Sequence, residues 1–163
     1  MLQPGFKVLH VQDIDFRSNY LTLTDALVEL RCWSEQHPNH LPVIITFTLT
    51  DDPIELPGSV KPLRFDRAAL DTLDKKLRSM LGEKMLILPD QVRGDHETLE
   101  AAVRASAWPT LVEARGRFLL VLDDFGRKRD DYLTDWRLNP DYRIRFEQGR
   151  CWRSNPETCK GGE

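Results

Sequence analysis

A helical pattern between two short apolar runs constrains the fold of this chain more than any other feature. The first run, Phe6–His10, ends in a histidine. The second, Val43–Leu49, is aliphatic and β-branched with little alternation, which is typical of a strand covered on both faces. Residues 22–37 lie between them and begin with Thr22 and Asp25 at a capping-box-like spacing. Because parallel strands need a crossover connection, usually a helix, we predict a βαβ unit with parallel strands.

The same alternation of elements continues along the chain. We predict further helices that begin at the N-cap residues Asp66 and Asp95. The other predicted elements are, in order, a strand at 85–88, a short helix at 110–114, a strand at 117–122, a helix at 127–136 and a strand at 142–146. Strands that begin near Phe6, Val43 and Arg117 are expected to be parallel neighbours joined by right-handed crossovers.

Length bounds the architecture. A whole (β/α) barrel normally needs at least about 200 residues, and this chain has 163. The order of the predicted elements indicates an α/β fold made of parallel βα units, and a chain of this length could form only an incomplete barrel, with Trp33 and Trp108 in its core. Residues 1–139 are assigned to this partial barrel domain. Residues 140–163 are assigned to a divergent, partly disordered C-terminal tail, because the chain is polar from Cys151 onward.

Composition and charge exclude several classes of partner. The net charge of −3 and the pI near 5.8 give no general attraction to nucleic acid or to an anionic membrane. No apolar run approaches the roughly 20 residues of a transmembrane segment, and residues 1–4 lack the regions of a signal peptide. Three cysteines are too few for a disulfide framework, and Cys151 and Cys159 either pair or remain free thiols. An incomplete barrel has open strand edges, so self-association is also expected.

His10 is the main candidate for chemistry. It ends the first predicted strand, and in (β/α) barrels the carboxyl ends of the strands and the loops that follow them carry the active site. The competing interpretation is a histidine on the surface or one that only satisfies local hydrogen bonds. Residues 51–65 contain Pro53, Pro57, Gly58 and Pro62, and we expect them to form a long loop at the mouth of the same site.

Four segments also carry a resemblance to a known family: PGFKVLHVQDIDFRSNYLTLTDALVELRCWSEQHPNHLPVIITFTLTDD, FDRAALDTLDKKLRSML, LILPDQVRGDHETLEAAV and WPTLVEARGRFLLVLDD. They resemble the middle of the catalytic domain of phosphoinositide-specific phospholipases C, most closely the bacterial calcium-dependent branch. The resemblance covers about residues 4–133. It implies a TIM-barrel-type fold of the PLC-like phosphodiesterase kind, of which this chain would form an incomplete part. It also implies a phosphoric diester hydrolase of lipid metabolism that acts on a phosphatidylinositol-type lipid, and a secreted or extracellular location.

The resemblance also implies a mechanism. The neighbouring inositol hydroxyl attacks the phosphate in line, with two histidines as base and acid. His10 matches the second histidine, as general acid or as donor to the phosphate oxygen, and the first would lie before residue 1. Calcium in the family is held by oxygen ligands; three of these positions would precede residue 1, and the fourth is Thr48, where the family has a carboxylate. Threonine is neutral and short, so we expect weak calcium binding and assign no metal ligand.

Other acidic residues have simpler interpretations. Asp51 and Asp52 are expected to be a solvated or helix-capping pair at the start of the long loop. Asp13 and Asp15 follow His10 and could hydrogen-bond its ring, although acids with this spacing in a loop more often stabilise turns. Asp123 ends a predicted strand and is a candidate for substrate binding. Its negative charge disfavours a polyphosphorylated headgroup relative to plain phosphatidylinositol.

The leading hypothesis is a phosphatidylinositol phospholipase C-type phosphodiesterase that uses histidine acid/base chemistry and calcium, with this chain inactive or poorly active on its own. One alternative is a non-catalytic, barrel-derived binding module. Another is a glycerophosphodiester phosphodiesterase-like enzyme, which would share the barrel and the histidines but act on other substrates.

Overall fold

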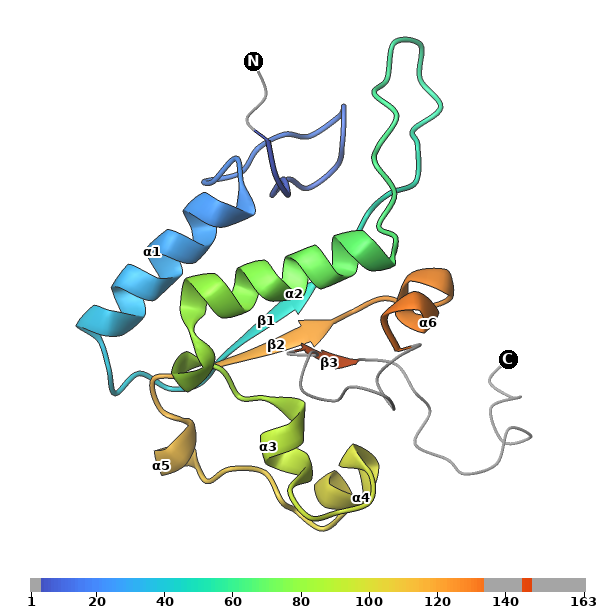
Figure 1. The fold of residues 1–163 in the computed structure, drawn as a ribbon. Helices are drawn as coiled ribbons and strands as arrows, with labels where there is room; N and C mark the ends of the chain where they lie inside the picture. The colour runs from blue at the N-terminus through green and yellow to red at the C-terminus, as the bar shows by residue number, and fades with distance from the viewer. Residues whose placement is uncertain (1–3, 134–144, 148–163) are drawn as a thin grey trace, which may run out of the picture.

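The computed structural model of the chain describes residues 4–133 and 145–147 (Figure 1). Its sheet has three parallel strands in the order β1-β2-β3, namely β1 (Val43–Phe47), β2 (Phe118–Leu122) and β3 (Arg145–Glu147). Val43 of β1 lies opposite Phe118 of β2, and the register continues without a break along both strands. The prediction of parallel neighbours that begin near Val43 and Arg117 is therefore confirmed.

Two long helices cover one face of this sheet. α1 (Leu23–Gln36) begins at Thr22, whose hydroxyl accepts a hydrogen bond from the backbone N–H of Asp25. α2 (Arg67–Leu81) begins at Asp66, whose carboxylate accepts a hydrogen bond from the third helical residue at 2.9 Å. Both N-caps are those that the sequence predicts, because their side-chain oxygens satisfy donors that the first helical turn leaves open.

Shorter elements complete the described chain: a 3-10 turn (Glu83–Met85), α3 (Pro89–Arg93), α4 (Leu99–Arg104), α5 (Leu111–Ala114) and α6 (Arg127–Leu133). The strand predicted at 85–88 is reduced to one parallel bridge between Leu86 and Phe118, because α3 begins at Pro89. The predicted cap at Asp95 is wrong. Thr98 caps α4 instead, and the residues before it form a turn.

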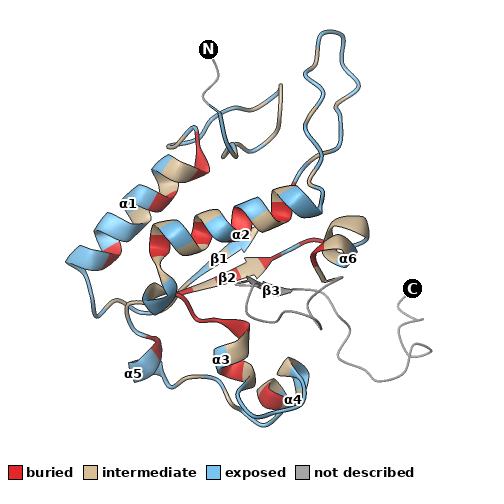
Figure 2. Cartoon of the chain, viewed as in Figure 1, coloured by how far each residue is buried: buried red, intermediate tan, exposed pale blue. Residues whose placement is uncertain are grey.

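The main core lies between the sheet and the layer of α1 and α2 (Figure 2). On β2 the alternate residues Phe118, Leu120 and Leu122 are fully buried. They pack in one cluster with buried side chains of the helices, namely Leu23, Leu27, Leu70, Leu73, Leu77, Leu81 and Tyr132. The Tyr132 hydroxyl donates a hydrogen bond to the buried Asp74 at 3.1 Å, which joins α6 to α2.

The opposite face of the sheet is only partly covered. Leu119 and Val121 of β2 pack against a second cluster of buried residues, Ile87, Val92 and Ala114, from the part of the chain that contains α3 and α5. On β1, however, Ile44 is 65% exposed and Thr46 is also exposed. The expectation that this strand is covered on both faces is wrong, because β1 is an edge strand and the second cluster covers β2 alone.

The predicted strand Phe6–His10 is not formed. Its backbone pairs with the start of α1 instead of with β1: Lys7 makes an isolated antiparallel bridge with Thr22, and the Leu23 N–H donates to the Phe6 carbonyl at 2.9 Å. The Phe6 ring stacks on Phe65 with 5.9 Å between the ring centroids. The prediction that this segment is a parallel neighbour of β1 is therefore wrong.

The two tryptophans expected in the core lie near the surface. Trp33 is 40% exposed. Its ring stacks on His37 and makes a tilted contact with His40, with centroid distances of 5.1 Å and 4.7 Å. Trp108 is 42% exposed. Apolar spacing alone does not reveal the partners of a side chain, and the partners of Trp33 are two imidazole rings: His37, which is exposed, and His40, which is partly buried and packs on Phe118.

Some predictions fall outside the described residues: the end of the last helix, the boundary at residue 139 and the tail with Cys151 and Cys159. Cys32 is a free, exposed thiol. No helix within residues 4–133 has the length and apolar character needed to cross a membrane.

The connections at the amino ends of β1 and β2 meet in close contact. Gly116 has a φ of +70°, and a Cβ atom at this position would lie 2.5 Å from the carbonyl oxygen of Pro38. The Gly116 N–H donates to the His40 carbonyl at 2.9 Å, and the Arg115 guanidinium donates to the Asn39 carbonyl at 2.6 Å. Both the backbone conformation and the available space therefore require glycine here.

Replacing a buried leucine of α2 should reveal the contribution of the main core. Leu77 is fully buried, so Leu77→Ala should lower the free energy of unfolding by about 2–5 kcal/mol through lost burial and a new cavity. Leu63→Ala is the matched control, since Leu63 is 91% exposed, and it should change stability by less than about 0.5 kcal/mol. Urea unfolding of both variants measures the difference, and equal effects would contradict the described core.

Candidate active-site edge

The carboxyl ends of β1 and β2 lie at one edge of the sheet. Thr48 directly follows β1 and Asp123 directly follows β2, and both residues are exposed. The Asp123 backbone N–H donates to the Phe47 carbonyl at 2.9 Å, which extends the parallel ladder by one hydrogen bond. The long loop 51–65 and the connection to α6 both leave from this edge (Figure 1). This is the edge where the sequence places the candidate site.

Buried ion pairs hold these two connections together. The side chain of Asp51 is 4% exposed and accepts hydrogen bonds from the Arg127 guanidinium at 2.7 Å and from the Phe65 N–H at 2.8 Å. The ammonium of Lys128 lies 3.6 Å from Asp51 and 3.3 Å from Asp124. The network thus connects the end of β1, both ends of the long loop and the first turn of α6.

The solvated or helix-capping interpretation of Asp51 is therefore wrong. Burial raises the pKa of the Asp51 carboxyl, but the hydrogen bonds from Phe65 and Arg127 and the charge of Lys128 outweigh burial, so the pKa lies below its ordinary value of 3.8. Asp52, its neighbour, is exposed, as expected. The sequence does not reveal this network, because Arg127 lies 76 residues from Asp51. The available signal was the i,i+4 spacing of Asp124 and Lys128.

His10 lies in a loop before α1, and its side chain is 76% exposed. Its Nδ1 atom lies 3.3 Å from a carboxylate oxygen of Asp15. Asp15 also accepts hydrogen bonds from the Arg17 side chain at 2.9 Å and 3.1 Å and from the Arg17 backbone N–H at 3.1 Å. The pKa of Asp15 is lowered to about 2, first by the hydrogen bonds from Arg17 and to a smaller extent by His10.

The loop that carries His10 is anchored to the long loop 51–65. The Asp13 carboxylate accepts a hydrogen bond from the Val60 N–H at 2.9 Å. The Gln12 amide donates to the Val60 carbonyl. Segments almost 50 residues apart in sequence are therefore joined directly. In the described structure no hydrogen bond or ion pair connects His10 with Thr48 or Asp123. The structure therefore does not bring these three candidate residues into one hydrogen-bonded site.

The described acids at this edge do not fit a calcium ion. Calcium takes about six to eight oxygen ligands, several of them from carboxylates. Asp51 and Asp124 are already paired with cations, and Thr48 is neutral. Across the described ranges, no group of three or more His, Cys, Asp or Glu side chains is arranged to hold a metal. We therefore derive no chemical step through calcium.

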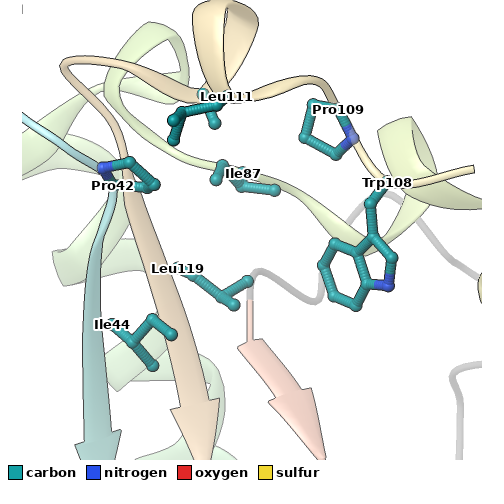
Figure 3. A pocket seen from close by; sticks show the side chains of 8 residues that line it. Pro42, Ile44, Ile87, Trp108, Pro109, Leu111 and Leu119 are labelled. Carbon is teal, nitrogen blue, oxygen red and sulfur yellow. The ribbon is translucent and has the colours of Figure 1, made fainter.

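An apolar pocket lies elsewhere, at the amino end of the strands (Figure 3). It has a volume of about 280 Å³ and is lined by Pro42, Ile44, Ile87, Trp108, Pro109, Leu111, Ala114 and Leu119. No charged or nucleophilic side chain lines it. None of the candidate residues His10, Thr48 and Asp123 lines this pocket.

Parallel βα units with loops gathered at one strand edge define an α/β protein, and the solved structures that share this fold identify it as part of a TIM-barrel-type fold. A family model described as phosphoinositide phospholipase C, Ca2+-dependent, matches residues 1–146. The chain belongs to this family. No curated protein matches the sequence.

Solved structures of the same type share the fold. One is a Ca2+-dependent phosphatidylinositol-specific phospholipase C from Streptomyces antibioticus, with 22% sequence identity and a TM-score of 0.58 over 80% of this chain and 42% of that one. Another is a calcium-dependent phosphoinositol-specific phospholipase C from a Gram-negative Pseudomonas species, with 19% identity and a TM-score of 0.57 over 77% and 41% of the two chains. The present chain thus spans about two fifths of the length of either structure.

Removing the charge of Asp51 should reveal the energy of the network and its pH dependence. A carboxyl whose pKa is lower in the folded state stabilises the fold above its unfolded pKa, and this contribution is lost as the pH falls through the folded value. Asp51→Asn should cost about 1–3 kcal/mol at pH 7. The difference from the wild type should shrink as the pH falls below about 4.

Urea unfolding between pH 7 and pH 3 measures this difference, and Asp52→Asn is the matched control because Asp52 is exposed. The control should match the wild type throughout. A constant gap between the wild type and Asp51→Asn down to pH 3 would argue against the buried pairing.

Proposed function

We propose that this chain is a phosphatidylinositol phospholipase C-like phosphodiesterase module that acts on an inositol phospholipid. The observation that carries the proposal is the family match over residues 1–146. In the proposed reaction the neighbouring inositol hydroxyl attacks phosphorus and gives its proton to a solvent water, while the phosphorus–oxygen bond to the diacylglycerol breaks. His10 acts as the general acid, and its proton passes to the departing oxygen. Histidine side chains suit this role because they exchange protons near neutral pH.

Exposed apolar side chains support a substrate that is presented in a lipid surface. They lie in the loops that precede α1, α2 and α6 and comprise Ile14, Phe16, Leu21, Leu56, Val60, Leu63 and Phe125. Leu63 and Phe125 are 91% and 83% exposed. Single exposed apolar residues are ordinary, but a group of them on neighbouring loops is typical of an interaction surface. The hydrogen bonds of Asp13 and Gln12 with Val60 keep two of these loops together.

The proposed activity of the chain alone is slow. The other described histidines are distant in the fold from the loop that carries His10: His37 and His40 contact Trp33 at the end of α1, and His96 lies in the turn before α4. Losing one member of an acid/base pair costs about a hundred- to ten-thousand-fold in rate. Calcium assistance, which the family name includes, is not assigned to any described residue. We also propose that the module acts outside the cell, because the phospholipase C family that it belongs to implies a secreted location.

A turnover assay on phosphatidylinositol vesicles tests the proposal. With the protein at high concentration and calcium in the millimolar range, the wild type should release water-soluble inositol phosphate slowly. His10→Gln should reduce this release by at least about tenfold. The matched control is His96→Gln, because His96 is exposed in a turn, and it should leave the rate unchanged. Calorimetry should detect no micromolar calcium binding.

Other outcomes would favour the alternatives. Vesicle binding without any His10-dependent release would favour a non-catalytic binding module. Faster release from soluble glycerophosphodiesters than from phosphatidylinositol would favour the glycerophosphodiester phosphodiesterase-like enzyme.

We also propose that the chain self-associates through β1. This strand is at the edge of the sheet, and Ile44 is exposed on the face that the second cluster leaves open. Edge strands present unpaired N–H and C=O groups that pair readily with another strand. Sedimentation velocity should show a mass that rises with concentration, and Ile44→Lys should abolish the rise. Val28→Lys, on the exposed side of α1, should not change it. A wild type that stays monomeric at every concentration would contradict this proposal.

A further inference from the structure

A tight turn brings a carboxylate back to the candidate histidine. Val11 and Asp15 form an antiparallel bridge in which the Asp15 N–H donates to the Val11 carbonyl at 2.8 Å and the Val11 N–H donates to the Asp15 carbonyl at 3.1 Å. Asp13, near the tip of the turn, has a left-handed φ of 58°. This backbone geometry places the Asp15 side chain next to residue 10, although the two residues are five positions apart in sequence.

The Asp15 carboxylate is an acceptor. The three hydrogen bonds from Arg17, with a smaller contribution from His10, lower its pKa to about 2, so it is ionised at neutral pH. An ionised carboxylate can only accept hydrogen bonds. Where Asp15 Oδ2 lies 3.3 Å from His10 Nδ1, the hydrogen therefore belongs to the imidazole nitrogen. In the neutral ring, Nε2 is then the unprotonated nitrogen, on a side chain that is 76% exposed.

We propose that Asp15 is a positioning residue for His10: it holds the Nδ1–H and leaves Nε2 as the nitrogen that exchanges a proton with the substrate. The inference rests on the proposed function, in which His10 is the general acid. Asp13, the other acid of the turn, has a different partner because it accepts the Val60 N–H of the long loop. One acid of the turn thus orients the ring, and the other fixes the turn to the neighbouring loop.

The tautomer of His10 tests the inference directly. In long-range proton–nitrogen NMR spectra of the 15N-labelled protein, recorded at a pH where the ring is neutral, His10 should be mainly in the Nδ1–H form. Asp15→Ala should shift it to the Nε2–H form that free histidine prefers. Asp15→Asn should preserve the Nδ1–H form, because the amide oxygen still accepts a hydrogen bond. Loss of the resonance in His10→Gln assigns it, and Asp52→Ala controls for loss of an exposed acid.

Two further measurements separate the possible failures. Asp15→Ala should lower the kcat for vesicle phosphatidylinositol by at least about tenfold with little change in KM, while Asp15→Asn recovers part of the rate. If the wild type proves inactive, the proposed function fails, but the tautomer still decides whether Asp15 orients the ring. An unchanged His10 tautomer in Asp15→Ala, with the amide spectrum of the rest of the protein preserved, overturns the inference.

Discussion

Parallel pairing of β1 with β2 is the constraint on which the rest of the described structure depends. A parallel pair cannot be joined by a tight turn, so the chain must return from the end of one strand to the start of the next. The return path includes α2, which packs with α1 on one face of the sheet over Phe118, Leu120 and Leu122. It also places the loops that leave β1 and β2 at the same edge. Thr48 and Asp123 lie at one edge because the two strands point the same way.

Elements with strong local signals could be predicted from the sequence. The N-caps Thr22 and Asp66 are properties of short segments, and the structure has them as predicted. The segment Phe6–His10 shows the limit of this reasoning. It has the composition of a strand, but whether it pairs with β1 or with Thr22 depends on partners elsewhere in the fold. Composition does not specify the partner of a strand.

The same distinction between local and long-range contacts applies to the candidate site. The contact between His10 and Asp15 is local, and the spacing of the acids in this turn indicated it in outline. The pairing of Asp51 with Arg127 joins residues 76 positions apart, and no local pattern specifies it. The bond from Val60 to Asp13 is equally long-range. The sequence thus shows which residues have suitable chemistry, whereas the loops that bring them to one edge follow from tertiary packing.

The contact at Gly116 has a consequence for how this fold can change. Any side chain there would collide with the Pro38 carbonyl and push apart the connections that lead into β1 and β2. The amino end of the sheet therefore tolerates few substitutions at this contact. The exposed loops at the other end carry few such restrictions: Leu63 can vary without disturbing the core. A chain built in this way can acquire new specificity at one end of its strands while the other end keeps the strands in register.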